Sequence, residues 1–143
     1  MDEKKPTFVL VPGAFHLHSS FDQVIAELHS ANYETRAGTL KSVNDANASV
    51  SDDVTFLREE LLLPLIEKGK DVVVVFHSYA GIPGSAAIRG LSKSERTSQG
   101  QKSGIIGLIY MCSFVPKEGS SLYDMIGGQW APWQEVHVSL FVS

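Results

Sequence analysis

Ser78 follows an apolar run at residues 72–76, with only His77 between, and small residues come after it. The run has the composition of a buried strand, and Ala80 and Gly81 suit a helix packed closely against that strand. A serine on a sharp strand-to-helix turn holds its hydroxyl above the sheet edge, where it can attack a carbonyl carbon. The helix N-terminus then faces the negative charge that develops. The segment predicts a serine nucleophile at Ser78; the alternative is an ordinary strand-to-helix turn.

A second segment, residues 9–16, ends another apolar run with a Pro-Gly turn. In hydrolases that carry the serine on such a strand-to-helix turn, two N–H groups stabilise the oxyanion, and one comes from the residue after the serine, here Tyr79. The other is expected in the loop after an early strand, from Ala14 or Phe15. A Pro-Gly turn without function is the alternative, and the neighbouring Ser78 segment favours the oxyanion hole.

The serine hydroxyl is a weak nucleophile that needs a base, and the chain has five histidines. His77 adjoins Ser78, but adjacent side chains on such a turn diverge, which argues for a packed histidine rather than a base. His16 lies in the predicted oxyanion loop. We expect His16 and His77 beside a substrate pocket. The other three are expected at the same loop, at a helix end and in the C-terminal tail, respectively: His18, His29 and His137.

The acidic residues offer no evident partner for a catalytic histidine. Asp52 and Asp53 suit a helix N-terminus, where the helix dipole favours negative charge. Asp124 and Glu135 follow the last predicted strand, but neither adjoins a strand end. The single cysteine, Cys112, is expected to be a small core residue. Neither a cysteine and histidine cluster with zinc spacing nor a phosphate-binding glycine motif occurs.

The elements that must position these residues alternate between apolar runs and segments with helical periodicity. Continuous runs rich in β-branched residues predict strands buried on both faces, and apolar residues three and four apart predict helices. The expected strands are residues 7–11, 33–39, 72–76 and 105–114, and the expected helices are residues 20–31, 51–69 and 80–90. This order predicts an α/β fold with a parallel sheet and right-handed helical crossovers.

Local signals refine these elements. Ser19 or Ser20 is a candidate cap for the first helix. Pro64 should kink the second helix, and Gly69 should end it. Residues 41–49 are polar and are expected to be a loop. Residues 91–103 are polar and serine-rich, and they are expected to be a surface loop or an extension of the preceding helix. Beyond Pro116 the regular pattern fades.

The composition limits the classes of function. The chain has 143 residues, 43% of them hydrophobic, which predicts one domain with a sizeable core. Its net charge is −4 and its basic residues are scattered, which argues against binding to nucleic acid or to a membrane surface. The N-terminus has no apolar signal segment, and the apolar stretch 104–115 is too short to span a bilayer. A cytoplasmic protein is therefore expected.

Three stretches together resemble the α/β-hydrolase fold family. They are FVLVPGAFH at residues 8–16, DVVVVFHSYAG at residues 71–81 and GLIYMCSFVP at residues 107–116. The likeness runs from about residue 7 to about residue 133, and it is strongest to the esterase and hydroxynitrile-lyase-like branch and its fungal relatives. The family pattern Gly-x-Ser-x-Gly has Phe76 and Ala80 at its two glycine positions here.

Members of that family are nearly twice as long. The resemblance implies a catalytic acid and histidine on later strands, after a cap inserted behind the strand that ends near Ser113. We therefore expect residues 1–143 to form a single incomplete domain that lacks the last strands and most of the cap. Residues 116–143 would be the start of the cap or an aberrant tail. Trp130 and Trp133 would be a remnant of the cap or an exposed pair.

The leading functional hypothesis is hydrolysis of a carboxylic ester, thioester or lactone by acyl transfer through Ser78. The partner would be a small, partly hydrophobic substrate, and the resemblance implies neither a metal nor an organic cofactor. Two alternatives stay open: an inactive, truncated hydrolase that binds a ligand or a partner, and a lyase on the same scaffold. An incomplete sheet would also leave an exposed edge at residues 105–114, which predicts self-association.

Overall fold

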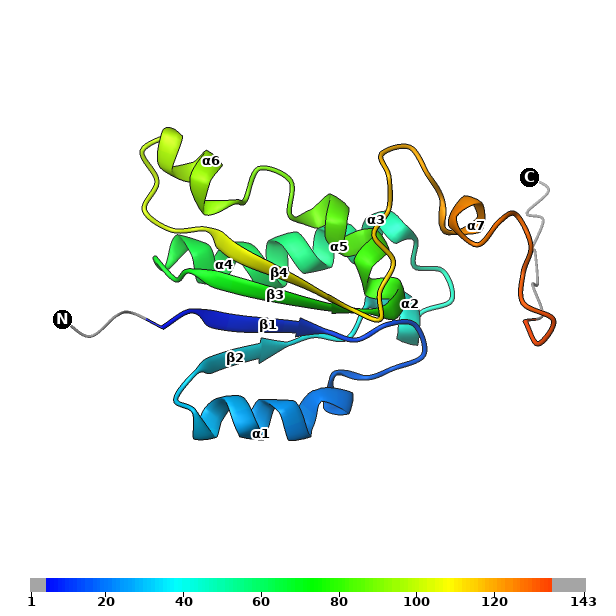
Figure 1. The fold of residues 1–143 in the computed structure, drawn as a ribbon, viewed down its shortest axis with the longest axis horizontal. Coiled ribbons are helices and arrows are strands. Elements are labelled where there is room, and N and C mark those ends of the chain that lie inside the picture. The colour runs from blue at the N-terminus through cyan, green and yellow to red at the C-terminus, as the bar shows by residue number, and fades with distance from the viewer. Residues whose placement is uncertain (1–4, 135–143) are drawn as a thin grey trace.

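The computed structural model describes residues 5–134, and these form a four-stranded parallel sheet flanked by helices (Figure 1). The strands are β1 (Thr7–Val11), β2 (Glu34–Ala37), β3 (Val72–His77) and β4 (Ile105–Met111), in the order β2-β1-β3-β4. Every pairing is parallel. The predicted α/β class is confirmed, because each parallel neighbour requires a crossover over a face of the sheet.

The two central strands place the predicted functional segments side by side. In the register of β1 and β3, Val9 lies opposite Val74 and Val11 opposite Phe76. Parallel strands end at the same edge of a sheet, so the loop after Val11 and the turn after His77 emerge as neighbours. This adjacency is what a site made from two segments more than sixty residues apart requires.

The first crossover begins with a 3₁₀ turn, His18–Phe21, and continues as α1 (Asp22–Ser30). The expected cap at Ser19 or Ser20 is wrong, because the residue that precedes α1 is Phe21, and it gives no side-chain hydrogen bond. Phe21 is buried and instead packs with Leu10 and Val75. Burial of this ring therefore fixes the start of α1.

The second crossover is one irregular helix made of α3 (Val50–Thr55), a π-helical segment (Phe56–Leu62) and α4 (Leu63–Glu67). Ser49 and Asp52 form a capping box at its start. Pro64 cannot donate to the carbonyl of Glu60 four residues earlier, and the Arg36 Nη2 group donates to that carbonyl at 2.9 Å instead. The irregularity expected from Pro64 thus takes the form of a π-helical segment, and Arg36 supplies the hydrogen bond that Pro64 cannot donate.

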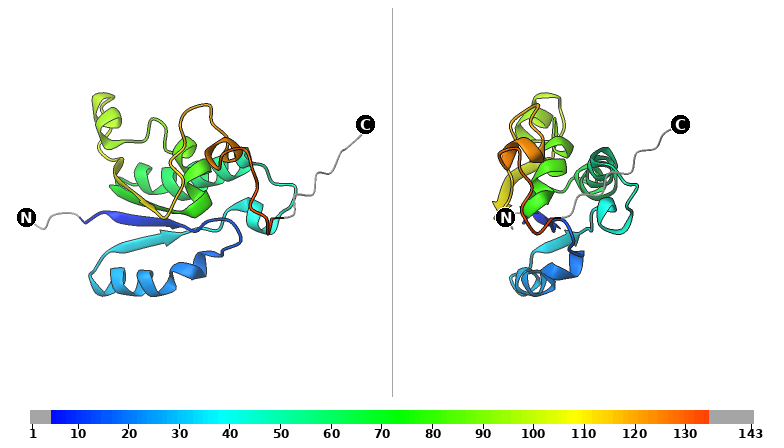
Figure 2. Two further views of the ribbon diagram at one scale, coloured as in Figure 1. Left: turned by 45° about the vertical axis from the view of Figure 1, so that its right-hand side comes forward. Right: turned by 90° about the vertical axis from the view of Figure 1, so that its right-hand side faces the viewer.

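Several short helices occupy the remaining segments. A 3₁₀ turn, Ser78–Ala80, leads into α5 (Gly81–Ala87), in place of the expected helix at residues 80–90. Residues 41–49, expected to be a loop, contain α2 (Lys41–Asn44), and residues 91–103 contain a separate helix, α6 (Lys93–Ser98). The last helix within residues 5–134 is α7 (Leu122–Met125), which lies beyond the sheet (Figure 2).

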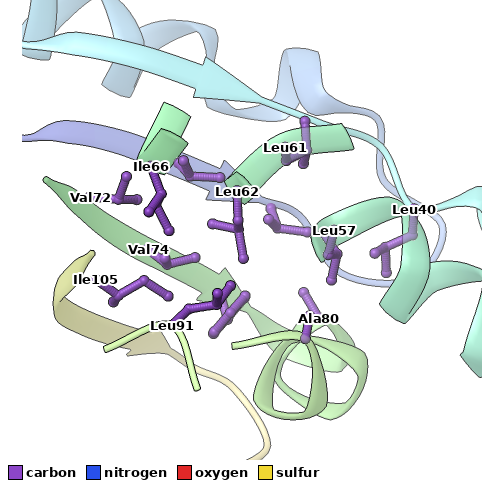
Figure 3. Close-up of a cluster of buried hydrophobic side chains, with 14 residues drawn as sticks. Leu40, Leu57, Leu61, Leu62, Ile66, Val72, Val74, Ala80, Leu91 and Ile105 are labelled. Atoms are coloured by element: carbon purple, nitrogen blue, oxygen red, sulfur yellow. The ribbon is translucent and has the colours of Figure 1, made fainter. Parts of the chain in front are cut away.

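The larger core cluster fills the space between the sheet and the helices of the second and third crossovers (Figure 3). Val72 and Val74 project from β3 toward Leu57, Leu62 and Ile66, all of which are almost completely buried. Each fully buried side chain of this size favours folding by about 1.5–3 kcal/mol. The cluster also contains Ala80, so the same core supports the segment that follows Ser78.

The fourth strand differs from the expectation of a buried strand at residues 105–114. It ends at Met111, and Cys112 has a φ of 45°, which takes the chain out of the extended conformation. Cys112 is exposed, so its prediction as a core residue is wrong. Within residues 5–134, β3 is the only strand that pairs with β4, although Ile105 also forms an isolated bridge with Ser92, and Ile109 is 46% exposed. The apolar run alone predicted a buried strand, whereas the exposed edge agrees with the expectation for an incomplete sheet.

Candidate active site

Ser78 occupies a strained turn between β3 and α5. Its φ is 54°, in the left-handed region that non-glycine residues rarely adopt. Strain of this kind costs about 1–3 kcal/mol and persists only where surrounding contacts hold it. His77 is still extended, with a φ of −103°, so the chain direction reverses at the serine itself. This is the backbone geometry that the sequence predicted for a serine nucleophile.

The carbonyl of Ser78 is held by the segment that follows β4. Ser113 Oγ donates to the Ser78 oxygen at 2.7 Å, and the Phe114 backbone N–H donates to the same oxygen at 3.2 Å. A Cβ atom at position 81 would collide with the Phe114 carbonyl, so Gly81 allows this close approach. These contacts, from residues 35 positions further along the chain, help to hold the strained turn.

Phe76, the large residue at a glycine position of the family pattern, fits without disturbing the turn. Its side chain is fully buried and packs against the Tyr110 ring, with ring centroids 5.5 Å apart. Gly84 in α5 lies against the Phe76 ring, and any Cβ there would overlap it. The small residues predicted at the start of α5 therefore provide the space for Phe76.

The loop after β1 lies directly against Ser78. A Cβ built on Gly13 would lie 2.7 Å from Ser78 Cβ and 3.2 Å from Ser78 Oγ, which is closer than side chains tolerate. Gly13 is therefore the residue that lets this loop approach the hydroxyl. The adjacency of the two predicted segments becomes an atomic contact at this point.

The backbone N–H groups of Ala14 and Phe15 are the predicted oxyanion donors of this loop. Among the described residues, the backbone hydrogen bonds of the loop use the N–H groups of Gly13 and His16 and leave those of Ala14 and Phe15 without an acceptor. Phe15 has a φ of 65°, and its side chain is 86% exposed. Tyr79 directly follows the serine in the 3₁₀ turn. The three predicted oxyanion residues thus lie in the turn and in the loop that contacts it.

The two histidines nearest the turn have different hydrogen-bond roles. The Gly13 N–H donates to His77 Nδ1 at 3.4 Å, so the lone pair of that nitrogen is engaged. His16 Nδ1 lies 2.8 Å from the Ala14 carbonyl oxygen, which can only accept, so His16 carries its proton there. The rings of His16 and His77 meet edge to face, with centroids 5.7 Å apart. The two rings are therefore in contact directly before the turn at Ser78, and their place beside a substrate pocket stays a prediction.

No catalytic base is assembled around the serine in residues 5–134, where neither a histidine nitrogen nor a carboxylate forms a hydrogen bond with Ser78 Oγ. Asp124, considered as an acid from the sequence, accepts hydrogen bonds from Ser121 in a capping box at the start of α7. That contact lowers the pKa of the Asp124 carboxyl. Glu135 and His137 lie outside the described residues.

Tyr79 contributes to the electrostatics behind the turn. Burial raises the pKa of its phenol, and the nearby Asp53 carboxylate raises it further. Asp53 is completely buried and accepts two hydrogen bonds from Ser42, at 3.1 Å from the backbone N–H and 2.6 Å from the hydroxyl. The sequence placed Asp53 at a helix N-terminus but did not reveal this buried role. The buried Asp53 carboxylate, which lies near Tyr79, therefore links α3 to α2 through Ser42.

A hollow of about 660 Å³ lies between α5 and residues 116–120, with Ile82 and Arg89 in its lining, but Ser78 does not line it.

Among residues 5–134, acidic, histidine and cysteine side chains do not gather in threes as a metal site would need. Every helix in this range is too short or too polar to cross a bilayer.

No protein-family model matches the chain, but two curated proteins are similar to it in sequence. It is 34% identical over 120 residues to the α/β hydrolase nvfD of Aspergillus novofumigatus, across 82% of this chain and 47% of that protein. It is 29% identical over 129 residues to a protein of Phoma sp. named as a probable hydrolase, across 87% of this chain and 49% of that protein.

Two solved structures share the fold. One is an extracellular α/β-hydrolase from a Paenibacillus species, with a TM-score of 0.58 and 17% identity over 83% of this chain and 45% of the other. The second is tomato methylketone synthase I complexed with 2-tridecanone, with a TM-score of 0.62 and 21% identity over 80% and 42% of the two chains.

The chain belongs to the α/β-hydrolase fold family, as its resemblance predicted. It spans about half the length of the curated relatives that it matches. The sheet and its helices are thus an incomplete α/β-hydrolase core.

Proposed function

We propose that Ser78 is the nucleophile of a hydrolase that cleaves a carboxylic ester, thioester or lactone by acyl transfer. The observation that carries the proposal is the left-handed backbone of Ser78 at the end of β3, beside a loop with free N–H groups. Ser78 Oγ would attack the carbonyl carbon. The N–H groups of Tyr79 and of Phe15 or Ala14 would stabilise the oxyanion, and each such donor contributes about 2.7–4 kcal/mol.

The substrate class follows from the side chains around the loop. Phe15 and Leu17 are exposed apolar residues on the same loop as the oxyanion donors. His16 and His77 would form the polar wall of the pocket. The tomato neighbour was solved with 2-tridecanone, a ketone with a long apolar chain. We therefore propose a small, partly hydrophobic acyl substrate for this chain.

The proposed hydrolysis also needs a base for Ser78, and the described residues do not bring one to its hydroxyl. This observation favours a second candidate, an inactive hydrolase fragment that binds a ligand or partner through the same surface. A lyase on this scaffold would need the same base. The candidates differ in turnover, because only a complete catalytic set releases its acyl product.

Hydrolysis of an activated ester by the full chain distinguishes the candidates. The hydrolase predicts turnover that Ser78→Ala abolishes and that Ser30→Ala, which changes a distant exposed serine on α1, leaves unchanged. An initial burst without turnover would indicate a reactive serine without a complete catalytic set. The hydrolase proposal fails if the wild type is no faster than Ser78→Ala.

A further inference from the structure

The ring of His77 connects the two halves of the candidate site. His77 is the last residue of β3 and directly precedes the strained Ser78. Its Nδ1 atom receives the Gly13 N–H from the loop after β1, across 64 positions of sequence. This side-chain contact therefore joins the nucleophile turn to the loop that carries Ala14 and Phe15.

The contact determines the tautomer of His77. Because Nδ1 accepts a hydrogen bond, a neutral His77 ring carries its proton on Nε2. The basic nitrogen of this ring is thus occupied by Gly13 and cannot at the same time remove a proton from Ser78. In this arrangement His77 cannot act as the catalytic base. It can only position the groups that it contacts.

His16 holds the same ring from a second direction. Its own ring meets the His77 ring edge to face at an interplanar angle of 89°. The His16 N–H donates to the Gly13 carbonyl at 3.4 Å, and His16 Nδ1 donates to the Ala14 carbonyl at 2.8 Å. The loop is thereby folded upon itself and against His77, while the Ala14 and Phe15 N–H groups form no hydrogen bond within residues 5–134.

We infer that His77 is a positioning residue that holds the oxyanion loop in register with Ser78 through its Nδ1 atom. The inference deepens the proposed function and rests on it for its catalytic consequence. An oxyanion donor acts only when it is fixed close to where the charge develops, so a loop that drifts by a fraction of an ångström loses its effect. His77 limits that drift without touching the substrate carbonyl.

Two substitutions separate the hydrogen bond from the bulk of the ring. His77→Asn retains an acceptor oxygen near the position of Nδ1, whereas His77→Phe retains a ring for the contact with His16 but has no acceptor. In His77→Phe we expect amide hydrogen exchange of Gly13 to accelerate about tenfold, the change expected when one hydrogen bond is lost. His77→Asn should keep the exchange rate within about threefold of the wild type.

The same variants give a chemical readout. The rate at which a fluorophosphonate modifies Ser78 should fall in His77→Phe and be restored in His77→Asn, because the reagent also develops negative charge at the oxyanion site. If wild-type Ser78 is not modified at all, the proposed hydrolase fails, while the Gly13 exchange measurement still decides the role of His77. Equal exchange of Gly13 in the wild type and His77→Phe would overturn the inference.

A measurement on the unaltered protein covers the case in which a variant does not fold. Nitrogen-detected NMR of the imidazole groups should show His77 protonated on Nε2 only, with Nδ1 coupled to the Gly13 amide. A His77 ring protonated on Nδ1 would contradict the inference, because that nitrogen could then not accept from Gly13.

Discussion

Ser113 Oγ donates to the carbonyl oxygen of Ser78 at 2.7 Å, and so the segment after β4 restrains the backbone of the candidate nucleophile. The donor is a neutral hydroxyl, and removing such a hydrogen bond costs about 1 kcal/mol. Ser113→Ala should therefore lower the free energy of unfolding by about that amount in urea denaturation. Ser98→Ala, which removes an exposed serine hydroxyl on α6, is the matched control. An equal effect of the two substitutions would show that Ser113 does not restrain the turn.

Gly13→Ala tests the close approach of the loop to Ser78. The new Cβ would lie 2.7 Å from Ser78 Cβ, so either the loop or the turn must move. We expect a loss of about 1–3 kcal/mol in stability and a marked fall in the rate of Ser78 modification. Gly107→Ala is the control, since a Cβ there would be at ordinary distance, 3.6 Å from Val73. Unchanged Ser78 reactivity in Gly13→Ala would contradict the described contact.

Asp53→Ala tests the buried carboxylate beneath Tyr79. It would leave the N–H and hydroxyl of Ser42 without their charged acceptor. A loss of about 2–4 kcal/mol is expected from calorimetry or denaturation, with a smaller loss for Asp53→Asn, which keeps one acceptor oxygen. Asp22→Asn removes an exposed carboxylate on α1 and should change stability by less than about 0.5 kcal/mol. Equal losses in Asp53→Ala and Asp22→Asn would refute this role.

The raised pKa of Tyr79 predicts a pH dependence of stability. The folded chain holds the Tyr79 proton more tightly than the unfolded chain, in which the phenol has its ordinary value of 10.0. This contribution is complete below pH 10.0 and is lost as the pH rises through the folded pKa. Denaturation across this range should show a steeper loss in wild type than in Tyr79→Phe. Parallel curves would contradict the burial of Tyr79 as the cause.

Self-association through the sheet edge stays a prediction. Ile106, Leu108 and Ile109 of β4 are between 41% and 49% exposed, and apolar edge strands favour pairing with other chains. Ile109→Lys should shift the chain toward the monomer in light scattering. Val24→Lys on α1, where the apolar side chain is 44% exposed, should not. A wild-type chain that is monomeric at all concentrations would show that the edge does not self-associate.

The sequence predicted the central strands and the turn at Ser78 because their signals are local. The apolar residues before His77 and the small residues after Ser78 indicate a strand and a closely packed helix without reference to distant segments. The two segments predicted to form an oxyanion hole also lie side by side, since parallel strands share an edge; their role in the oxyanion hole stays a prediction. Pro64 likewise gave a local irregularity, although a π-helical segment with Arg36 as external donor could not be foreseen.

The features that sequence reasoning missed depend on partners far along the chain. Ser113 meets Ser78, and Asp53 meets Ser42, only after the sheet and its crossovers form. Gly81 beside the turn was the one available signal, because a glycine there indicates that another backbone approaches. The exposure of Cys112 was also hidden, since an apolar run predicts a strand but does not show what covers it. The exposed edge at β4 was expected only because the chain resembles part of a longer fold.

Mass-spectrometric mapping of a fluorophosphonate adduct tests the central claim most directly, because it asks whether Ser78 is an activated nucleophile on a preorganised turn. The account predicts one adduct per chain, located on the peptide that contains Ser78, absent from Ser78→Ala and retained in Ser30→Ala. An unmodified wild-type chain, or an adduct that persists in Ser78→Ala, would contradict it.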